Sequence, residues 1–168
     1  MKIFIPKKIK ETCWKFLSNH TLGNRGIADG NKKEQFVGLV GEVLTKEIFG
    51  IKHKFENGFD GGFDFKYQNK KIDVKTMSRI VDIKDHYVHN FIAFQQNYNC
   101  DVYIFNSINK KTNELTICGW VTKKELKERS IFYKKGTIRK RSDGSSFKMK
   151  ADTFEIKNNM LNNIKELL

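Results

Sequence analysis

A change of hydrophobic period constrains the fold of this chain more than any other feature of its sequence. Across residues 32–49 apolar side chains recur every three or four positions, which predicts an amphipathic helix that ends near Gly50. In residues 63–67 and 71–77 apolar and polar side chains alternate, which predicts two short strands. Because a short polar turn separates these strands, we expect them to pair as a β-hairpin. The chain therefore runs from a long helix directly into a sheet.

The rest of the sequence predicts further helices and strands around this unit. Thr122 followed by Glu125 has the spacing of a capping box and opens a short helix. The further expected elements are helices at residues 7–19, 122–129 and 158–168 and strands at residues 87–94, 102–108 and 115–121. Because no linker or internal repeat interrupts this order, we predict one α/β or α+β domain over residues 1–168.

The charge of the chain favours a polyanionic partner. It has 32 Lys and Arg against 19 Asp and Glu, a formal net charge of +13. Such an excess is typical of proteins that bind nucleic acid or an anionic membrane surface. No apolar run reaches the roughly 18 residues of a membrane span, and the apolar stretch near the N-terminus is too short for a signal peptide. We therefore expect a cytoplasmic protein with no membrane partner.

Three carboxylates and one lysine between residues 42 and 75 form a candidate catalytic site. Asp73 and Lys75 are two positions apart on a predicted strand, so their side chains leave the same face of the sheet. Pairing of the hairpin can bring Asp64 beside Asp73, and Glu42 lies on the preceding helix. Carboxylate oxygens are ligands that Mg²⁺ prefers, and a neighbouring lysine can hold an attacking water and offset charge on a phosphate. These residues predict Mg²⁺-dependent hydrolysis of phosphodiester bonds.

Each of these side chains also has a simpler interpretation. Asp73 and Lys75 can belong to an ordinary charged strand face, and Glu42 can pair with Lys46 four residues later on the helix. Asp60 competes with Asp64 for the role of first aspartate. We favour Asp64 because it lies within the alternating strand, whereas Asp60 precedes two glycines and suits a turn.

The order of these residues resembles the PD-(D/E)XK nuclease superfamily, which includes restriction endonucleases and Holliday junction resolvases. The resemblance covers about residues 32–121 and lacks the proline that precedes the first aspartate of the family pattern. It implies a restriction endonuclease-like fold, with a mixed central β-sheet flanked by helices, and Lys75 as the catalytic lysine. It also implies four residues that hold Mg²⁺, for which Mn²⁺ can substitute: Glu42, Asp64, Asp73 and Val74.

Basic residues outside this site are candidates for contacts with DNA. Residues 134–150 are rich in Lys and Arg around a central Ser-Asp-Gly turn and predict a basic hairpin. Two lysines and a glutamine follow a glycine-rich loop at residues 20–31. The candidate DNA-binding residues are Lys32, Lys33, Gln35, Lys134, Lys135, Arg139, Lys140, Arg141, Lys148 and Lys150.

Together these features predict a Mg²⁺-dependent DNA endonuclease that acts on duplex or branched DNA. A chain of this length is expected to hold one site, so cutting both strands predicts a homodimer. Two alternatives stay open from the sequence: an exonuclease of the same superfamily, and a catalytically inactive DNA-binding protein on a nuclease-like fold.

Overall fold

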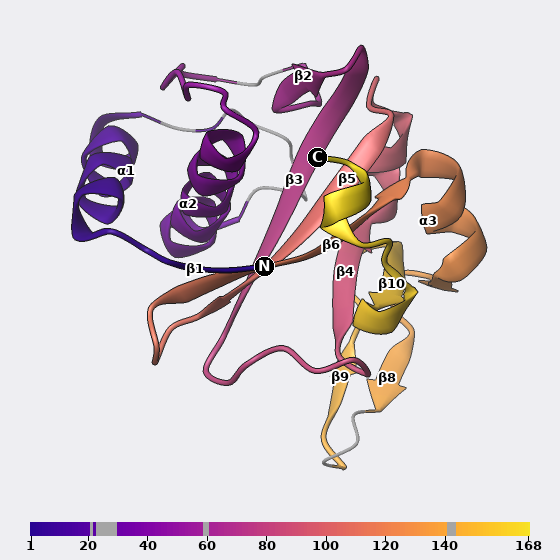
Figure 1. The fold of residues 1–168 in the computed structure, drawn as a ribbon. Helices are drawn as coiled ribbons and strands as arrows, with labels where there is room; N and C mark the ends of the chain where they lie inside the picture. Colours follow the sequence, from indigo (N-terminus) through magenta and orange to yellow (C-terminus); the bar gives the residue numbers. More distant parts are fainter. Residues whose placement is uncertain (21, 23–29, 59–60, 141–143) are drawn as a thin grey trace.

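The computed structural model describes residues 1–20, 22, 30–58, 61–140 and 144–168 (Figure 1). The α-helices in these ranges are α1 (Lys7–Asn19), α2 (Lys32–Ile48) and α3 (Lys123–Arg129). The strands are β1 (Lys2–Phe4), β2 (Phe65–Tyr67), β3 (Lys70–Arg79), β4 (Val88–Ile92), β5 (Val102–Asn109), β6 (Glu114–Thr122), β7 (Ile131–Tyr133), β8 (Ile138–Lys140), β9 (Ser146–Lys148) and β10 (Thr153–Lys157). Short 3-10 helices are η2 (Ala93–Asn97), η3 (Asn158–Met160) and η4 (Ile164–Glu166).

The strands form one mixed sheet and two smaller antiparallel sheets. The five-stranded sheet has the order β1-β6-β5-β3-β2, in which β3 and β5 are parallel and the other neighbours are antiparallel. The three-stranded sheet has the order β4-β10-β7, and β8 pairs with β9. The expected class, a mixed α+β fold with a mixed sheet and helices, is confirmed.

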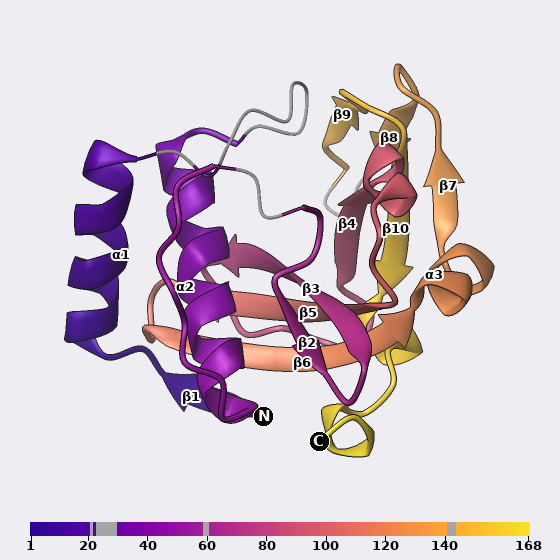
Figure 2. The same ribbon diagram turned by 90° about the horizontal axis from the view of Figure 1, so that it is seen from above.

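Strand β5 lies at the centre of the molecule and separates two hydrophobic cores. All of its residues are buried, and successive side chains of a strand point to opposite faces. Ile104 packs into a core shared with α1 and α2, whereas Tyr103 and Phe105 pack into a core shared with β4, β10 and α3. Figure 2 shows α1 and α2 on one side of the five-stranded sheet, with β4, β10 and α3 on the other. The sheet is therefore the middle layer of three.

Most of the elements expected from the sequence are confirmed within one or two residues. The hairpin of β2 and β3 turns through Gln68 and Asn69, which have φ values of +46° and +63° and so match a tight two-residue turn. The capping box of α3 is formed, with Thr122 Oγ1 accepting from the Glu125 N–H at 3.1 Å. The basic hairpin is present as β8 and β9, and Ser142 and Asp143 of the expected turn lie outside the described residues.

The expected C-terminal helix is wrong. Residues 158–168 form η3 and η4, and between them Asn162 pairs with Trp120 of β6 through two backbone hydrogen bonds of 3.1 and 2.9 Å. Asparagine favours caps and turns over helix interiors, and Asn163 caps η4 through its side chain. Ile164 and Leu167 still pack into the core. Strands β1, β7 and β10 were not expected from the sequence.

The position of α2 over the sheet depends on a glycine. A Cβ added to Gly41 would lie 1.9 Å from Thr76 Oγ1 and 2.8 Å from Thr76 Cβ on β3, well inside van der Waals contact. Gly38, one turn earlier on the same helix, has no atom within 4 Å of such a Cβ. Gly41 therefore allows the backbone of α2 to approach β3 closely.

We predict that Gly41→Ala destabilises the protein and Gly38→Ala does not. Overpacking at Gly41 is expected to cost about 1–3 kcal/mol. At Gly38 the same change removes a helical glycine without a clash and is expected to stabilise by roughly 0.5–1 kcal/mol. Urea unfolding of both variants measures the difference. Equal stability of the two variants would contradict the close approach of α2 to β3.

His89 on β4 is a buried histidine of the second core. It has no exposed surface, its Nε2 lies 3.2 Å from Asn158 Oδ1, and its ring packs against Phe105 at 5.2 Å between centroids. Burial lowers the pKa of His89 from 6.5 to about 4, against a smaller raising effect of the hydrogen bond with Asn158. His89 therefore stays neutral in the folded protein at neutral pH.

This pKa shift predicts a loss of stability in mild acid. Below about pH 6.5 the unfolded chain binds a proton at His89 that the folded protein takes up only near pH 4. The free energy of unfolding should therefore fall by ~3 kcal/mol over this range on account of His89. His89→Phe should remove this part of the pH dependence, whereas the same change at the exposed His86 should leave it intact. Urea unfolding at several pH values between 7 and 4 tests both variants.

Candidate functional site

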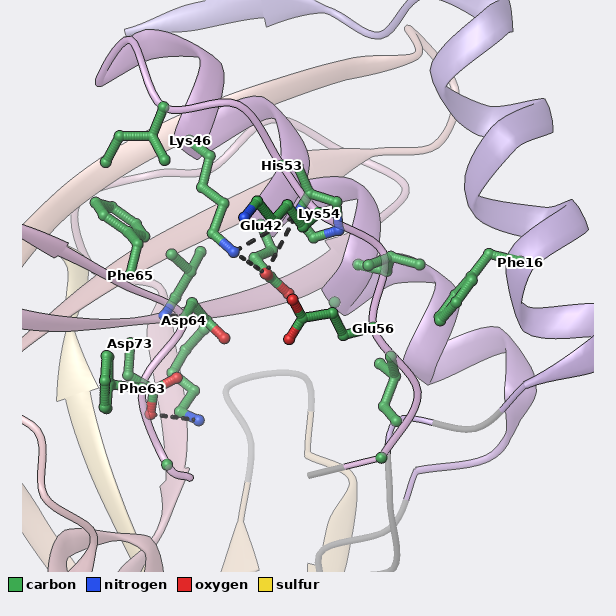
Figure 3. Close-up of a pocket in the computed structure, with 18 of the residues that line it drawn as sticks. Phe16, Glu42, Lys46, His53, Lys54, Glu56, Phe63, Asp64, Phe65 and Asp73 are labelled. Atoms are coloured by element: carbon green, nitrogen blue, oxygen red, sulfur yellow. Dashed lines mark hydrogen bonds and ion pairs between the residues drawn. The ribbon is translucent and has the colours of Figure 1, made fainter. Parts of the chain in front are cut away.

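A pocket of about 470 Å³ opens between α2, the segment at residues 51–58 and the β2–β3 hairpin (Figure 3). Acidic and basic side chains both line it. Among the described residues, its carboxylates are Glu42, Glu56, Asp64 and Asp73, and its basic side chains are Lys46, Lys52, His53, Lys54 and Lys75. The four residues that the sequence singled out as catalytic therefore share one cavity.

Backbone pairing holds Asp64 at the edge of β3. The Asp64 N–H donates to the Ile72 carbonyl at 2.8 Å, and Asp64 Oδ2 accepts from the Val74 N–H at 2.6 Å. The pairing of β2 with β3 ends at Ile72. At Val74, two residues further along β3, the Asp64 carboxylate accepts the hydrogen bond that a neighbouring strand would otherwise accept. In a strand the N–H and C=O of one residue point to the same side, and the Val74 carbonyl therefore faces the same edge.

Asp73 and Lys75 form an ion pair beside this edge. Lys75 Nζ lies 2.8 Å from Asp73 Oδ2, and their side chains are 19% and 8% exposed. Both project from the face of β3 opposite α2, where Lys75 Nζ lies 5.7 Å from the centre of the Phe91 ring. The ion pair fixes the lysine next to Asp73, in the pocket that Asp64 also lines.

Glu42 reaches the pocket from α2, but its carboxylate is already engaged. Its Oε1 lies 2.6 Å from Lys46 Nζ and 3.3 Å from His53 Nδ1. Burial alone would raise the pKa of Glu42, but the hydrogen bond to His53 and the Lys46 ammonium together lower it. Glu42 is therefore ionised and paired. In the described ranges no three Asp, Glu, His or Cys side chains group closely enough to hold a metal ion.

Lys46 and His53 were not among the candidate site residues from the sequence. The four-residue spacing of Glu42 and Lys46 on a helix predicted their ion pair, and the structure contains it. His53 follows the end of α2 in an irregular segment, so no periodicity placed it against Glu42. Asp60, the alternative to Asp64, lies outside the described residues.

The candidate DNA-binding residues fall into two groups. Lys32 and Lys33 are exposed in the first turn of α2, and Gln35 donates through Nε2 to the Gly30 carbonyl at 2.9 Å. The second group lies on the hairpin and its flanks, which Figure 2 shows beside β4 and β10, across the sheet from α1 and α2. Its exposed members are Lys134, Lys135, Lys140, Lys148 and Lys150.

Arg139 differs from the other residues of this basic hairpin. Its Nη2 lies 2.9 Å from Glu155 Oε1 on β10, and its guanidinium stacks over the Tyr133 ring. The Glu155 side chain is 4% exposed, so this ion pair ties the hairpin to the second sheet. Arg141 lies outside the described residues.

Comparisons of the chain with protein-family models, with curated proteins and with solved structures found no match. Within the described ranges, no helix combines the length and apolar character needed to cross a membrane.

Proposed function

We propose that this chain is a Mg²⁺-dependent DNA endonuclease with a restriction endonuclease-like fold of the PD-(D/E)XK type. One observation carries the proposal: Asp64, Asp73 and Lys75 meet at the edge of β3 in an open pocket. The Val74 N–H fixes Asp64, and the Lys75–Asp73 ion pair of 2.8 Å fixes the lysine. A carboxylate pair with an adjacent ammonium is a suitable set of groups for phosphodiester hydrolysis.

The oxygen atoms at this edge suit Mg²⁺. The ion usually takes one or two protein carboxylates and completes its coordination with water and substrate phosphate. Asp64, just before β2, and Asp73 on β3 supply two carboxylates, and the Val74 carbonyl faces the same edge. When bound, Mg²⁺ would polarise the scissile phosphate and offset the negative charge that develops on it.

Three side chains of the protein have the other roles in the proposed reaction. Lys75 donates hydrogen bonds to the attacking water and to phosphate oxygens, which positions the nucleophile and stabilises the transition state. Asp73 orients the Lys75 ammonium through their ion pair. Asp64 is held by a backbone amide, so its carboxylate needs little rearrangement before it acts.

The charge of the protein supports DNA as the substrate. The net charge is +13, and exposed lysines lie at the start of α2 and on the basic hairpin. Contacts of lysine with the phosphate backbone give affinity that depends little on sequence and falls with salt. Cleavage of both strands would then use a homodimer, because each chain holds one such pocket among its described residues.

A plasmid-nicking assay with Mg²⁺ tests this function. Asp73→Asn and Lys75→Met should each lower the rate of nicking about 100-fold or more, because each removes a charge next to the scissile phosphate. Lys124→Met serves as the matched control, because this exposed lysine lies on α3 and pairs with Glu128. Undiminished cleavage by either site variant would contradict the proposed site.

The same assay separates the two alternatives. An exonuclease would degrade linear DNA and leave covalently closed circles intact. An inactive DNA-binding protein would bind in a salt-dependent manner and cleave neither substrate in Mg²⁺ or Mn²⁺.

A further inference from the structure

Lys46 is a buried ammonium of the pocket that has no role in the proposed mechanism. Lys46 lies on α2, one turn after Glu42, and its side chain is 10% exposed. It lines the same pocket as Asp64, Asp73 and Lys75. Figure 3 shows Lys46 and Glu42 reaching into the pocket from one wall, with Asp64 and Asp73 on another.

We propose that Lys46 is a phosphate-binding residue of this pocket and that Glu42 is its anchor rather than a metal ligand. The inference rests on the proposed function and names the group that contacts the DNA phosphate from the α2 wall. His53, which lies 3.3 Å from Glu42 Oε1, is a positioning residue that holds the anchor in place.

The contacts of Glu42 favour the role of an anchor. One oxygen, Oε1, is close to both Lys46 Nζ at 2.6 Å and His53 Nδ1 at 3.3 Å. The carboxylate is therefore balanced by groups of the chain itself, and a metal ion would have to displace them. Because a buried charge without its partner is strongly unfavourable, this pair resists such an exchange.

The contacts of Lys46 leave it able to bind a further anion. An ammonium group has three N–H donors, and Glu42 takes one of them. His53 Nδ1 lies 3.5 Å from the same ammonium, but a ring nitrogen that donates its proton to Glu42 cannot also accept from Lys46. No further acceptor for Lys46 is found in the described part of the chain, so the ammonium keeps donors for a ligand in the pocket.

A phosphodiester is the ligand that this arrangement suits. The pocket presents two ammonium–carboxylate pairs from different layers, Lys75–Asp73 from the sheet and Lys46–Glu42 from the helix. A phosphate between them could receive hydrogen bonds from both lysines. Because its negative charge grows during hydrolysis, these contacts would strengthen in the transition state.

Titration with Mn²⁺ in the absence of DNA, followed by calorimetry, tests whether Glu42 is an anchor. Glu42→Gln should bind Mn²⁺ within about threefold of the wild type, whereas Asp73→Asn should lose about tenfold or more in affinity. Equal losses in the two variants would show that Glu42 is a metal ligand and overturn the inference. Failure of the wild type to bind Mn²⁺ would instead overturn the proposed function, and with it this inference.

The salt dependence of DNA binding tests the contact of Lys46 with phosphate. Lys46→Met should reduce the slope of log K against log salt by about one, because one phosphate contact is lost. Lys124→Met, with an exposed lysine on α3, should leave the slope unchanged. An unchanged slope in Lys46→Met would overturn the inference, because a purely structural lysine contributes no counterion release.

A double variant keeps the test informative if Lys46→Met alone does not fold. Glu42→Gln with Lys46→Met removes both charges, so no unpaired charge stays buried. It should show the same reduced slope as Lys46→Met, and thermal unfolding should confirm its fold. A double variant with the wild-type slope would overturn the inference.

Discussion

The pairing of β2 with the beginning of β3 is the constraint on which the candidate site depends. Phe65 lies opposite Ile72, and beyond this point no strand among the described residues pairs with this edge of β3 at Val74. Asp64, the residue before β2, binds the Val74 amide there. Because side chains alternate along a strand, a shift of the register by one residue would turn Asp73 and Lys75 toward α2. The tight turn at Gln68 and Asn69 fixes the register that prevents this.

The two hydrophobic cores explain why charged side chains can lie at this edge of β3. Ile72 and Val74 are buried in the core beneath α2, whereas Asp73 and Lys75 project from the other face of the same strand. The close approach of α2 at Gly41 then brings the next residue on the helix, Glu42, to the rim of the pocket. Apolar packing on both sides of the sheet thus leaves these charged groups at the edge of β3, where the pocket opens.

The sequence predicted those elements whose pattern is local. The alternation in residues 63–77 identified the hairpin because one face of each strand packs inward, and the spacing of Asp73 and Lys75 placed them together. Strand β10 was not predicted although it has the same alternation, because it is only five residues long, with Phe154 and Ile156 between three polar residues. The terminal segment was misjudged because a backbone pairing of Asn162 with Trp120 overrides its helical spacing. His53 contacts Glu42 because the irregular segment after α2 folds back toward the helix. The hydrophobic periodicity of a sequence does not predict the path of such a segment.

The distribution of charge over the molecule bears on how a DNA substrate would enter the pocket. The outer surface carries exposed lysines that attract phosphates at long range. Inside, Asp73 and Glu42 are each paired with a lysine, so the pocket offers a polyanion much less net attraction than the surface around it. Asp64 and Asp73 would repel a phosphate unless a cation lay between these carboxylates and the phosphate. In the proposed function, the surface therefore supplies affinity for any DNA. Binding of a phosphate at the edge of β3 then depends on a divalent ion.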